Sequence, residues 1–341
     1  MDRLSLMDVQ KRMTGDSSST MKVAEILSKT MPLLADAVWV PTNKTDTRTT
    51  LVRTGLPKAF VRRANQGTMI GKSTVVPNEE ATCTYEIYAE NDVRVINSFG
   101  DQRRNARATE SRAFIESVGQ SACTTAWYGN KAADPDLIDG LAVRYDALTG
   151  QTYSQNVLDG GAPASSSDCA SMYLIQWDEN KVAMTYPKHA QNESHGIVEH
   201  DDEGLITTNF GTDATRRLMP VYRDRFSISY GWTVSDWRCI ARTKFLSTGQ
   251  LATQAVEQNP AMVQSKLRFF MIQMMYRMPQ LGGKLCFYMN RTLAQYLDIE
   301  SLRSVGNAGM TYKDVQGMPV LHFRGVPIRI DDSLLNNETR V

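Results

Sequence analysis

The sequence contains no long apolar run. No stretch approaches the ~18 consecutive apolar residues of a membrane-spanning helix. The first residues, Met1 to Ser5, lack the basic-then-apolar pattern of a secretory signal peptide. Both absences predict a protein that does not contact membranes and is not exported by a signal peptide.

Cysteine is scarce and scattered. An odd number of widely separated thiols predicts reduced cysteines and a cytosolic folding compartment. No Cys-x-x-Cys pair occurs, so the usual zinc motif is missing. The five cysteines are Cys83, Cys123, Cys169, Cys239 and Cys286.

The usual enzyme motifs are also missing, since neither Gly-x-Ser-x-Gly nor Gly-x-Gly-x-x-Gly occurs. The segment Gly67–Ser73 resembles a phosphate-binding P-loop, but only three residues separate its glycines, where four are needed. It leads into the strand-like run Thr74–Pro77 instead of a helix. We therefore expect no catalytic residue, no cofactor and no nucleotide site.

One histidine cluster admits a rival interpretation. His195, His200 and Asp202 could serve a metal-dependent hydrolase, and His189 precedes them. However, the histidines are six and five residues apart, which matches no helical face. The pattern favours a solvated acidic loop without a metal.

Composition indicates a folded protein. The chain has 341 residues, 42% hydrophobic and 22% charged, which suits a globular protein of two domains. The formal net charge of +1 gives no support for a dedicated nucleic-acid binder.

Residues 47 to 98 form the most informative stretch, because they predict one long projecting β-hairpin. Six basic and no acidic residues lie between Thr47 and Asn78, and the turn falls at Arg62–Gly67. We interpret Cys83–Glu90, which alternates apolar and polar residues, as the return limb.

An isolated two-stranded hairpin is marginally stable in water, so this one needs a surface to rest on. Another copy of the chain could supply that surface, because the basic block is followed by acidic patches. The alternative is that these charges are only solvated. The residues predicted to lie at a subunit interface are Arg53, Lys58, Arg62, Arg63, Lys72, Glu79 and Glu80.

The rest of the chain mixes helices and strands. Residues 101–128 predict a long helix with an apolar stripe, and residues 172–177 and 182–186 predict a β-hairpin. Apolar and polar residues alternate from 226 to 234, and this alternation breaks before Trp237, which predicts a β-bulge. The remaining expected elements are helices at 4–13, 21–28, 259–278 and 292–303, a strand at 285–289, and a final strand pair within 320–330. The stripe of the long helix comprises Ala108, Ser111, Ile115, Val118, Ala122 and Ala126.

Six segments, spread in order along nearly the whole chain, are familiar when taken together. They are Thr54–Pro57 with the Arg62–Asn65 tip, Tyr85–Asp92, Trp127–Asn130, Ser235–Arg238, Phe287–Thr292 and Gly325–Arg329. These segments resemble the major capsid proteins of tailed bacteriophages, in the epsilon-fifteen-like branch of the Hong Kong 97-type fold.

This resemblance implies an α+β fold with an N-terminal arm, an extended β-hairpin loop, a peripheral domain built on a long spine helix, and an axial domain of mixed sheet and helices. Placed on this chain, the arm is 1–46 and the extended loop 47–96. The peripheral domain is 97–135 with 220–248, and the axial domain is 136–219 with 249–341.

The resemblance also implies a structural function. We expect hexamers and pentamers that close into an icosahedral head around double-stranded DNA. The expected partners are further copies of the chain, a separate scaffolding protein, a portal, a decoration protein, and packaged DNA in non-specific contact with the inner face. The protein would be located in the virion after assembly in the host bacterial cytoplasm. A neck or tail protein of the same virus is the alternative structural role.

Overall fold

The computed structural model describes residues 29–188, 198–209, 217–256, 266–279, 282–303, 310–315 and 318–340. In chain order the helices are α2 (Pro32–Asp36), α3 (Val93–Asn97), α4 (Arg103–Tyr128), α5 (Leu141–Arg144), α6 (Thr248–Val256), α7 (Lys266–Arg277) and α8 (Arg291–Arg303), with 3-10 turns η1 (Gly100–Gln102), η2 (Thr152–Asn156) and η4 (Trp237–Cys239). The strands are β1 (Trp39–Pro41), β2 (Thr47–Gly55), β3 (Thr74–Ala81), β4 (Cys83–Asp92), β5 (Val157–Asp159), β6 (Cys169–Trp177), β7 (Val182–Tyr186), β8 (Glu199–Asn209), β9 (Leu218–Val234), β10 (Ile240–Ser247), β11 (Lys284–Met289), β12 (Met310–Val315), β13 (Met318–Phe323) and β14 (Val326–Ile330).

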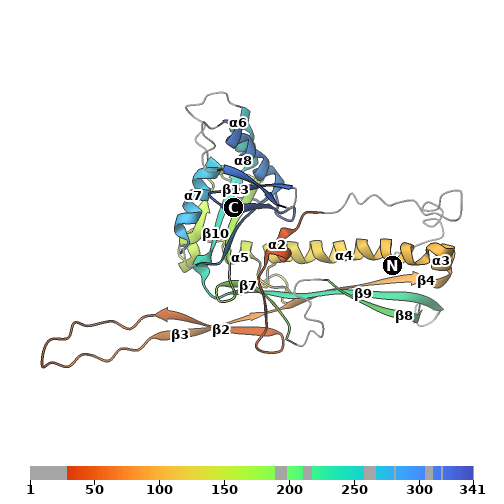
Figure 1. The fold of residues 1–341 in the computed structure, drawn as a ribbon, viewed down its shortest axis with the longest axis horizontal. Coiled ribbons are helices and arrows are strands. Elements are labelled where there is room, and N and C mark those ends of the chain that lie inside the picture. Colours follow the sequence, from red (N-terminus) through yellow and green to blue (C-terminus); the bar gives the residue numbers. More distant parts are fainter. Residues whose placement is uncertain are drawn as a thin grey trace.

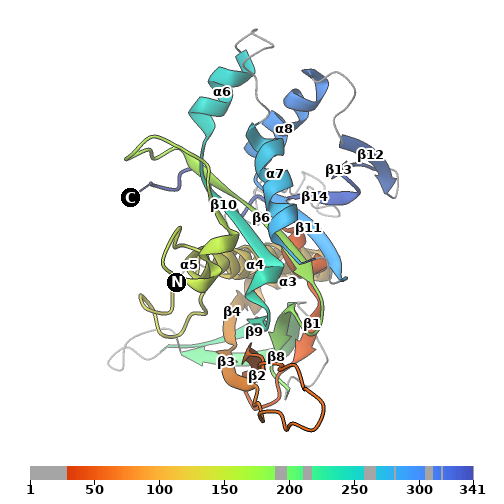
Figure 2. The same ribbon diagram turned by 90° about the vertical axis from the view of Figure 1, so that its left-hand side faces the viewer.

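The chain is elongated and has three parts (Figure 1). A hairpin made of β2, β3 and the loop between them projects at one end of the long axis. The ribbon lobe, in which α4 lies along strands β4, β9 and β8, extends to the other end. The sheet lobe, built on β6, β10 and β11 with α6, α7 and α8, rises from the middle (Figures 1 and 2).

Strand β9 is the central strand of the ribbon lobe. It pairs antiparallel with β4 from Val221 to Tyr230 and with β8 from Leu218 to Ser227. The predicted alternation in β4 is present, since Cys83 and Ala89 are buried while Thr84 is exposed. The interpretation of residues 83–90 as the return limb of the hairpin is wrong, because β3 pairs with β2 and β4 pairs with β9.

The predicted long helix exists as α4, but its buried face differs from the predicted stripe. Val118, Ala122 and Ala126 are buried, whereas Ile115 is 40% exposed and Ala108 is also exposed. The helix contacts the ribbon in both halves: Phe114 stacks on Phe226 with ring centroids 5.9 Å apart, and the hydroxyl of Tyr230 donates to the Ala122 carbonyl at 2.8 Å. Periodicity alone could not show which residues of the predicted stripe face solvent.

Strand β6 is buried on both faces and divides the sheet lobe from the ribbon lobe. Tyr173, Ile175 and Trp177 join the core beneath α4, while Met172 and Leu174 join the core with α7 and α8. Because alternate residues of a strand point to opposite faces, one strand supplies both cores.

The prediction that β6 and β7 form a hairpin is wrong. The turn at residues 178–181 is present, since the Lys181 amide donates to the Asp178 carbonyl at 3.1 Å. Trp177 and Val182 pair next to this turn, but beyond it the strands separate: β6 pairs with β10 and β11, and β7 pairs with β9 and β1. Composition identified the turn, but the partner of each strand is set by distant residues.

The predicted bulge before Trp237 is also wrong. β9 ends at Val234, a 3-10 turn follows at Trp237–Cys239, and β10 begins at Ile240. The shift in apolar phase marks the end of one strand and the start of another. Asp236 holds this turn, because its carboxylate accepts from the Arg238 amide at 3.0 Å.

The last third agrees with the prediction in the described residues. The helix α7 buries Leu267, Phe270, Met271 and Met274. The positive φ angles of Gly282 and Gly283, 79° and 100°, let the chain turn into β11, and β13 and β14 pair around the expected turn at 324–325. The expected helices at 4–13 and 21–28, and Met262, lie outside the described residues.

All five cysteines are free and buried. Burial raises the pKa of Cys83 to about 11 and that of Cys239 to about 12, so these thiols stay protonated near neutral pH. The prediction of reduced thiols is confirmed.

Trp232 tests the junction of the two cores. It is fully buried, stacks on Trp177 with ring centroids 5.7 Å apart, and donates its indole N–H to the Ala126 carbonyl at 3.0 Å. Trp232→Ala should lower the free energy of unfolding by about 3 to 5 kcal/mol. Urea unfolding of the unassembled subunit measures this. Val61→Ala, at a 96% exposed position, is the control and should change stability by less than about 0.5 kcal/mol. Equal effects of the two substitutions would contradict the assignment of Trp232 to the core.

Candidate functional site

The hairpin has almost no packing partner within its own chain. Strands β2 and β3 form a separate two-stranded sheet, and the loop from 56 to 73 is extended apart from a turn at 64–65. Asn65 adopts a φ of 61° there, and the Gln66 amide donates to the Arg63 carbonyl at 3.2 Å. The predicted position of the tip is therefore confirmed.

Large apolar side chains on the hairpin face solvent, which is unusual for a folded monomer. Ile70 is 100% exposed and Val61 96% exposed, and others extend along both limbs. Such a surface is typical of a site that another protein covers. The remaining exposed apolar residues of the hairpin are Leu51, Leu56, Phe60, Met69, Val75 and Val76.

The base of the hairpin, in contrast, is firmly held. Asn43 and Thr49 exchange two hydrogen bonds of 2.7 and 2.8 Å, and Arg48 donates to the Pro41 carbonyl at 2.6 Å. The Thr82 amide donates to the Asp46 carbonyl at 2.9 Å. A projecting arm with a fixed base keeps a constant direction.

The basic side chains predicted at the interface lie along this arm and are exposed. Arg62 donates to the Gln66 carbonyl at 3.1 Å, and the Lys58 ammonium lies 5.6 Å from the centroid of the Phe60 ring. Within the part of the chain that the structure describes, no carboxylate forms an ion pair with Arg53, Lys58, Arg62, Arg63 or Lys72.

The two acidic residues of the predicted interface have partners inside the subunit. Lys44 hydrogen-bonds Glu79 at 2.7 Å and lowers the pKa of this exposed carboxyl. Glu80 is buried in an ion pair with Arg144 on α5, and its other oxygen accepts from the Val234 amide at 2.9 Å. Glu80 therefore ties the hairpin to its own subunit.

The ribbon lobe carries the opposite charge. Strands β4, β8 and β9 together contain eight carboxylates and two arginines. Arg107 on α4 bridges Asp202 and Asp224 at 3.0 and 2.9 Å, and Arg223 contacts Glu90 at 2.6 Å. These pairs order the side chains but leave an excess of negative charge on the surface.

The histidine cluster gives no metal site in the residues that can be described. His189 and His195 lie outside them. His200 and Asp202 belong to strand β8 instead of the predicted loop, and His200 contacts Asp224 at 3.0 Å while stacking on Phe226. Among the described residues no group of three or more histidine, cysteine or carboxylate side chains could hold a metal ion.

The P-loop-like segment is part of the exposed hairpin loop, and Thr74, which follows it, starts strand β3. Since no helix N-terminus follows, the segment lacks the geometry with which a P-loop binds a nucleotide phosphate. Over the described ranges, no helix is both long and apolar enough to cross a membrane.

Comparisons with known proteins identify the family. The model of the family "Major capsid protein GP7" matches residues 15–341. The chain belongs to this family. A comparison with curated protein sequences gave no match.

The fold is shared with a solved bacteriophage structure. A chain from the structure of bacteriophage Epsilon15 superposes with a TM-score of 0.71 at 24% identity, covering 100% of this chain and 98% of that one. A chain of an empty GTA particle capsid superposes with a TM-score of 0.43 at 9% identity, covering 72% of this chain and 100% of that one. A chain of Microbacterium phage Oxtober96 superposes with a TM-score of 0.41 at 11% identity, covering 70% of this chain and 98% of that one.

The chain is thus a structural protein of a phage capsid with the Hong Kong 97-type α+β fold, and the predicted resemblance is confirmed. As a capsid subunit it assembles with further copies of itself and is located in the virion. Nothing supports the hydrolase alternative. The exposed apolar residues of the hairpin were missed by sequence analysis, although Val61 and Ile70 beside basic residues were a visible signal.

Glu79 and Glu80 are adjacent acids with different surroundings, which gives a matched test. Glu80→Ala should lower the stability of the unassembled subunit by about 2 to 4 kcal/mol, because it leaves Arg144 without its partner. Glu79→Ala should leave the stability almost unchanged, since the pair with Lys44 is exposed to solvent. Chemical denaturation of both variants measures the difference. Equal stabilities would show that Glu80 has no structural role inside the subunit.

Proposed function

We propose that this chain forms hexamers and pentamers that close into an icosahedral head around double-stranded DNA, and that the hairpin holds each subunit to its neighbour. The observation that carries the proposal is the exposure of apolar side chains such as Val61 and Ile70 on an arm with a fixed base. Folding leaves this surface in water, so association is the step that can bury it.

We infer that the ribbon lobe of the next subunit receives the hairpin. The hairpin carries six basic and no acidic side chains from Thr47 to Asn78, while strands β4, β8 and β9 carry an acidic excess. The two surfaces lie at opposite ends of the long axis (Figure 1), which suits a head-to-tail contact that repeats around a ring. Complementary charge sets the register, and repetition in a closed shell turns a modest contact into a stable one.

We further propose the remaining expectations for assembly. A separate scaffolding protein, a portal and a decoration protein would act with the shell, which forms in the host bacterial cytoplasm and contacts packaged DNA non-specifically on its inner face. The arm at 1–46, the extended loop at 47–96, and the peripheral and axial boundaries stay predictions. The pairing of β4 with β9 supports ending the projecting part of the loop near residue 81.

The proposed role depends on binding and includes no catalytic turnover. The chain carries no P-loop of the required spacing and no nucleophile motif. Saturable hydrolysis of ATP or an ester that is lost on Lys72→Ala or His195→Ala would contradict this part of the proposal.

The hairpin tip provides the main test. Arg62→Glu with Arg63→Glu should abolish shells while leaving the subunit folded, because both side chains are exposed and neither forms an ion pair among the described residues. Like charges at an interface cost several kcal/mol, and a shell repeats that cost at every equivalent contact. Electron microscopy and sedimentation measure assembly, and circular dichroism measures folding.

A matched control is the pair of exposed lysines Lys131 and Lys188, which lie outside the hairpin and outside the ribbon lobe, reversed to glutamate in the same way. This variant has the same net charge but an unaltered hairpin, so shells should form. Normal shells from the hairpin variant would show that the tip does not hold subunits together. Loss of shells in both variants would indicate an effect of total charge instead.

A further inference from the structure

The end of the ribbon lobe that lies farthest from the hairpin carries a group of arginines. Helix α3 and the first turns of α4 lie at this end (Figure 1). Residues 93–113 contain five arginines, two carboxylates and no lysine. Arg107 has partners, since it bridges Asp202 and Asp224. The other four arginines are exposed and form what we name the arginine patch: Arg94, Arg103, Arg104 and Arg112.

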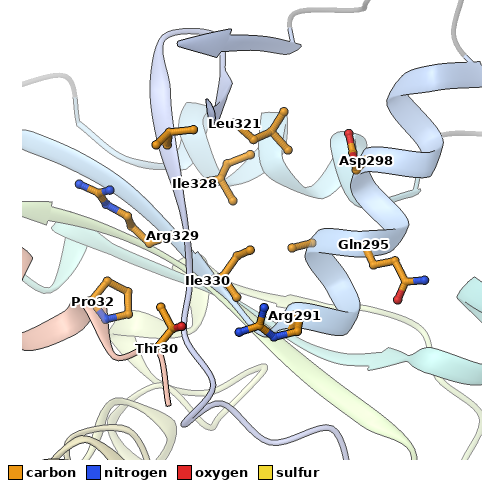
Figure 3. A pocket seen from close by; sticks show the side chains of 11 residues that line it. Thr30, Pro32, Arg291, Gln295, Asp298, Leu321, Ile328, Arg329 and Ile330 are labelled. Atoms are coloured by element: carbon orange, nitrogen blue, oxygen red, sulfur yellow. The ribbon is translucent and has the colours of Figure 1, made fainter. Parts of the chain in front are cut away.

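The guanidinium groups of the arginine patch keep their charge free for a ligand. Among the described residues, none of them forms an ion pair with a carboxylate. The arginines that line the apolar groove between α8 and β14 differ in this respect (Figure 3). There Arg291 contacts Asp332 at 2.8 Å, and Arg329 contacts Asp36 at 2.8 Å. An anion therefore finds unpaired arginines at the patch and paired ones at the groove.

Two of these arginines occupy positions that the helix itself disfavours. The first turn of α4 is the positive end of the helix dipole, where cations are unfavourable, and it contains no acidic residue. Arg103 and Arg104 lie in this turn, and Arg103 donates to the neutral side chain of Asn97 at 3.3 Å. Residues that oppose the local stability of an element are typical of functional surfaces. A negatively charged ligand would explain why arginines stand here.

The surface between the arginines is flat and has little apolar character. Arg104 and Arg112 are eight residues apart, which is about 12 Å along the helix axis. The exposed residues Ala108 and Ala113 lie between and beside them, so no long apolar side chain projects there. Among the described residues of α4, the exposed large apolar side chain is Ile115, at 40%. Protein interfaces are anchored by buried aromatic and apolar residues, so this surface favours a polyanion over a protein.

We propose that the arginine patch is the surface through which this subunit binds double-stranded DNA, by contacts to its phosphates. The planar guanidinium group matches phosphate oxygens with two parallel hydrogen bonds. Contacts to phosphates carry no sequence information, which suits a protein that encloses a whole genome. The inference rests on the proposed function and deepens it by naming the residues that meet the DNA.

The assignment also gives the ribbon lobe two sides of opposite charge. The acidic strands β4, β8 and β9 lie along one side of α4 (Figure 1), and their carboxylates would repel a phosphate backbone. The exposed face of α4 points away from these strands. One side of the lobe is thereby suited to the basic hairpin of a neighbour, and the other side to DNA.

Duplex binding by the unassembled full chain tests the arginine patch. The probe is a fluorescent duplex of about 20 base pairs, and fluorescence anisotropy gives Kd between about 50 and 200 mM salt. Arg104→Gln with Arg112→Gln removes two phosphate contacts and keeps good helix formers in α4. We expect Kd at the lowest salt to rise about tenfold or more, and the slope of log K against log salt to fall by about 2.

Two matched variants separate location and charge from unfolding. Arg62→Gln with Arg63→Gln removes the same charge from the hairpin and should bind the duplex as the unmodified chain does. Arg104→Lys with Arg112→Lys keeps the charge of the patch and should retain most of the affinity. Circular dichroism verifies the fold of each variant. If the first glutamine variant does not fold, Arg94→Gln with Arg112→Gln replaces it.

The inference and the proposed function can fail separately, because electron microscopy of the unmodified chain reports shells independently of duplex binding. Shells together with no duplex binding by the unmodified chain, or with equal losses in the patch and hairpin variants, would overturn the inference alone. Unchanged duplex binding by the patch variant, with loss of its association with a scaffolding protein, would show a protein site and also overturn it. A chain that binds the duplex through the patch yet forms no shells would overturn the proposed function alone.

Discussion

A layer of buried aromatic side chains joins the ribbon lobe to the sheet lobe, and the orientation of every projecting part depends on it. Trp127, at the end of α4, packs on Tyr173 and Tyr288 with ring centroids 4.8 and 5.7 Å away. Trp177 donates to the Tyr288 hydroxyl at 2.9 Å and stacks on Trp232. Four elements, α4, β6, β9 and β11, therefore meet in one set of rings.

The same aromatic layer also holds the C-terminal segment of the chain in place. The indole of Trp127 donates to Asp331 at 3.1 Å, just after β14, and burial raises the pKa of that carboxyl. Further along, Glu338 accepts from the Tyr128 and Ser171 hydroxyls and pairs with the buried Arg242 at 3.2 Å. The C-terminal segment thus closes the junction, so that spine helix and sheet lobe move as one body. A fixed junction of this kind lets the projecting hairpin meet its partner in a constant geometry.

Sequence patterns predicted those parts of the fold that depend on local residues. The turn at Asn65, the helix α4 and the buried face of α7 follow from turn chemistry and periodicity, because neighbours along the chain determine them. Strand partners did not follow, since the choice of β9 for β4 depends on residues more than a hundred positions away. Glu80 shows the same limit for the candidate site: its sequence context matches that of Glu79, and only the fold brings Arg144 beside it.

The hairpin combines two properties that conflict in a free subunit. Exposed side chains such as Val61 and Ile70, next to strands with open edges, favour indiscriminate association. The basic residues between and beside them, Arg62, Arg63 and Lys72, oppose it, because two hairpins of like charge repel each other. Charged residues that flank an apolar segment are a common means of preventing such aggregation. An acidic surface attracts the basic hairpin instead of repelling it, and the apolar residues of the hairpin can then contact that surface. The same charges that keep free hairpins apart would therefore select the ribbon lobe of a neighbour. Specific growth of a shell, in preference to aggregation, is the physical consequence of placing both kinds of residue on one arm.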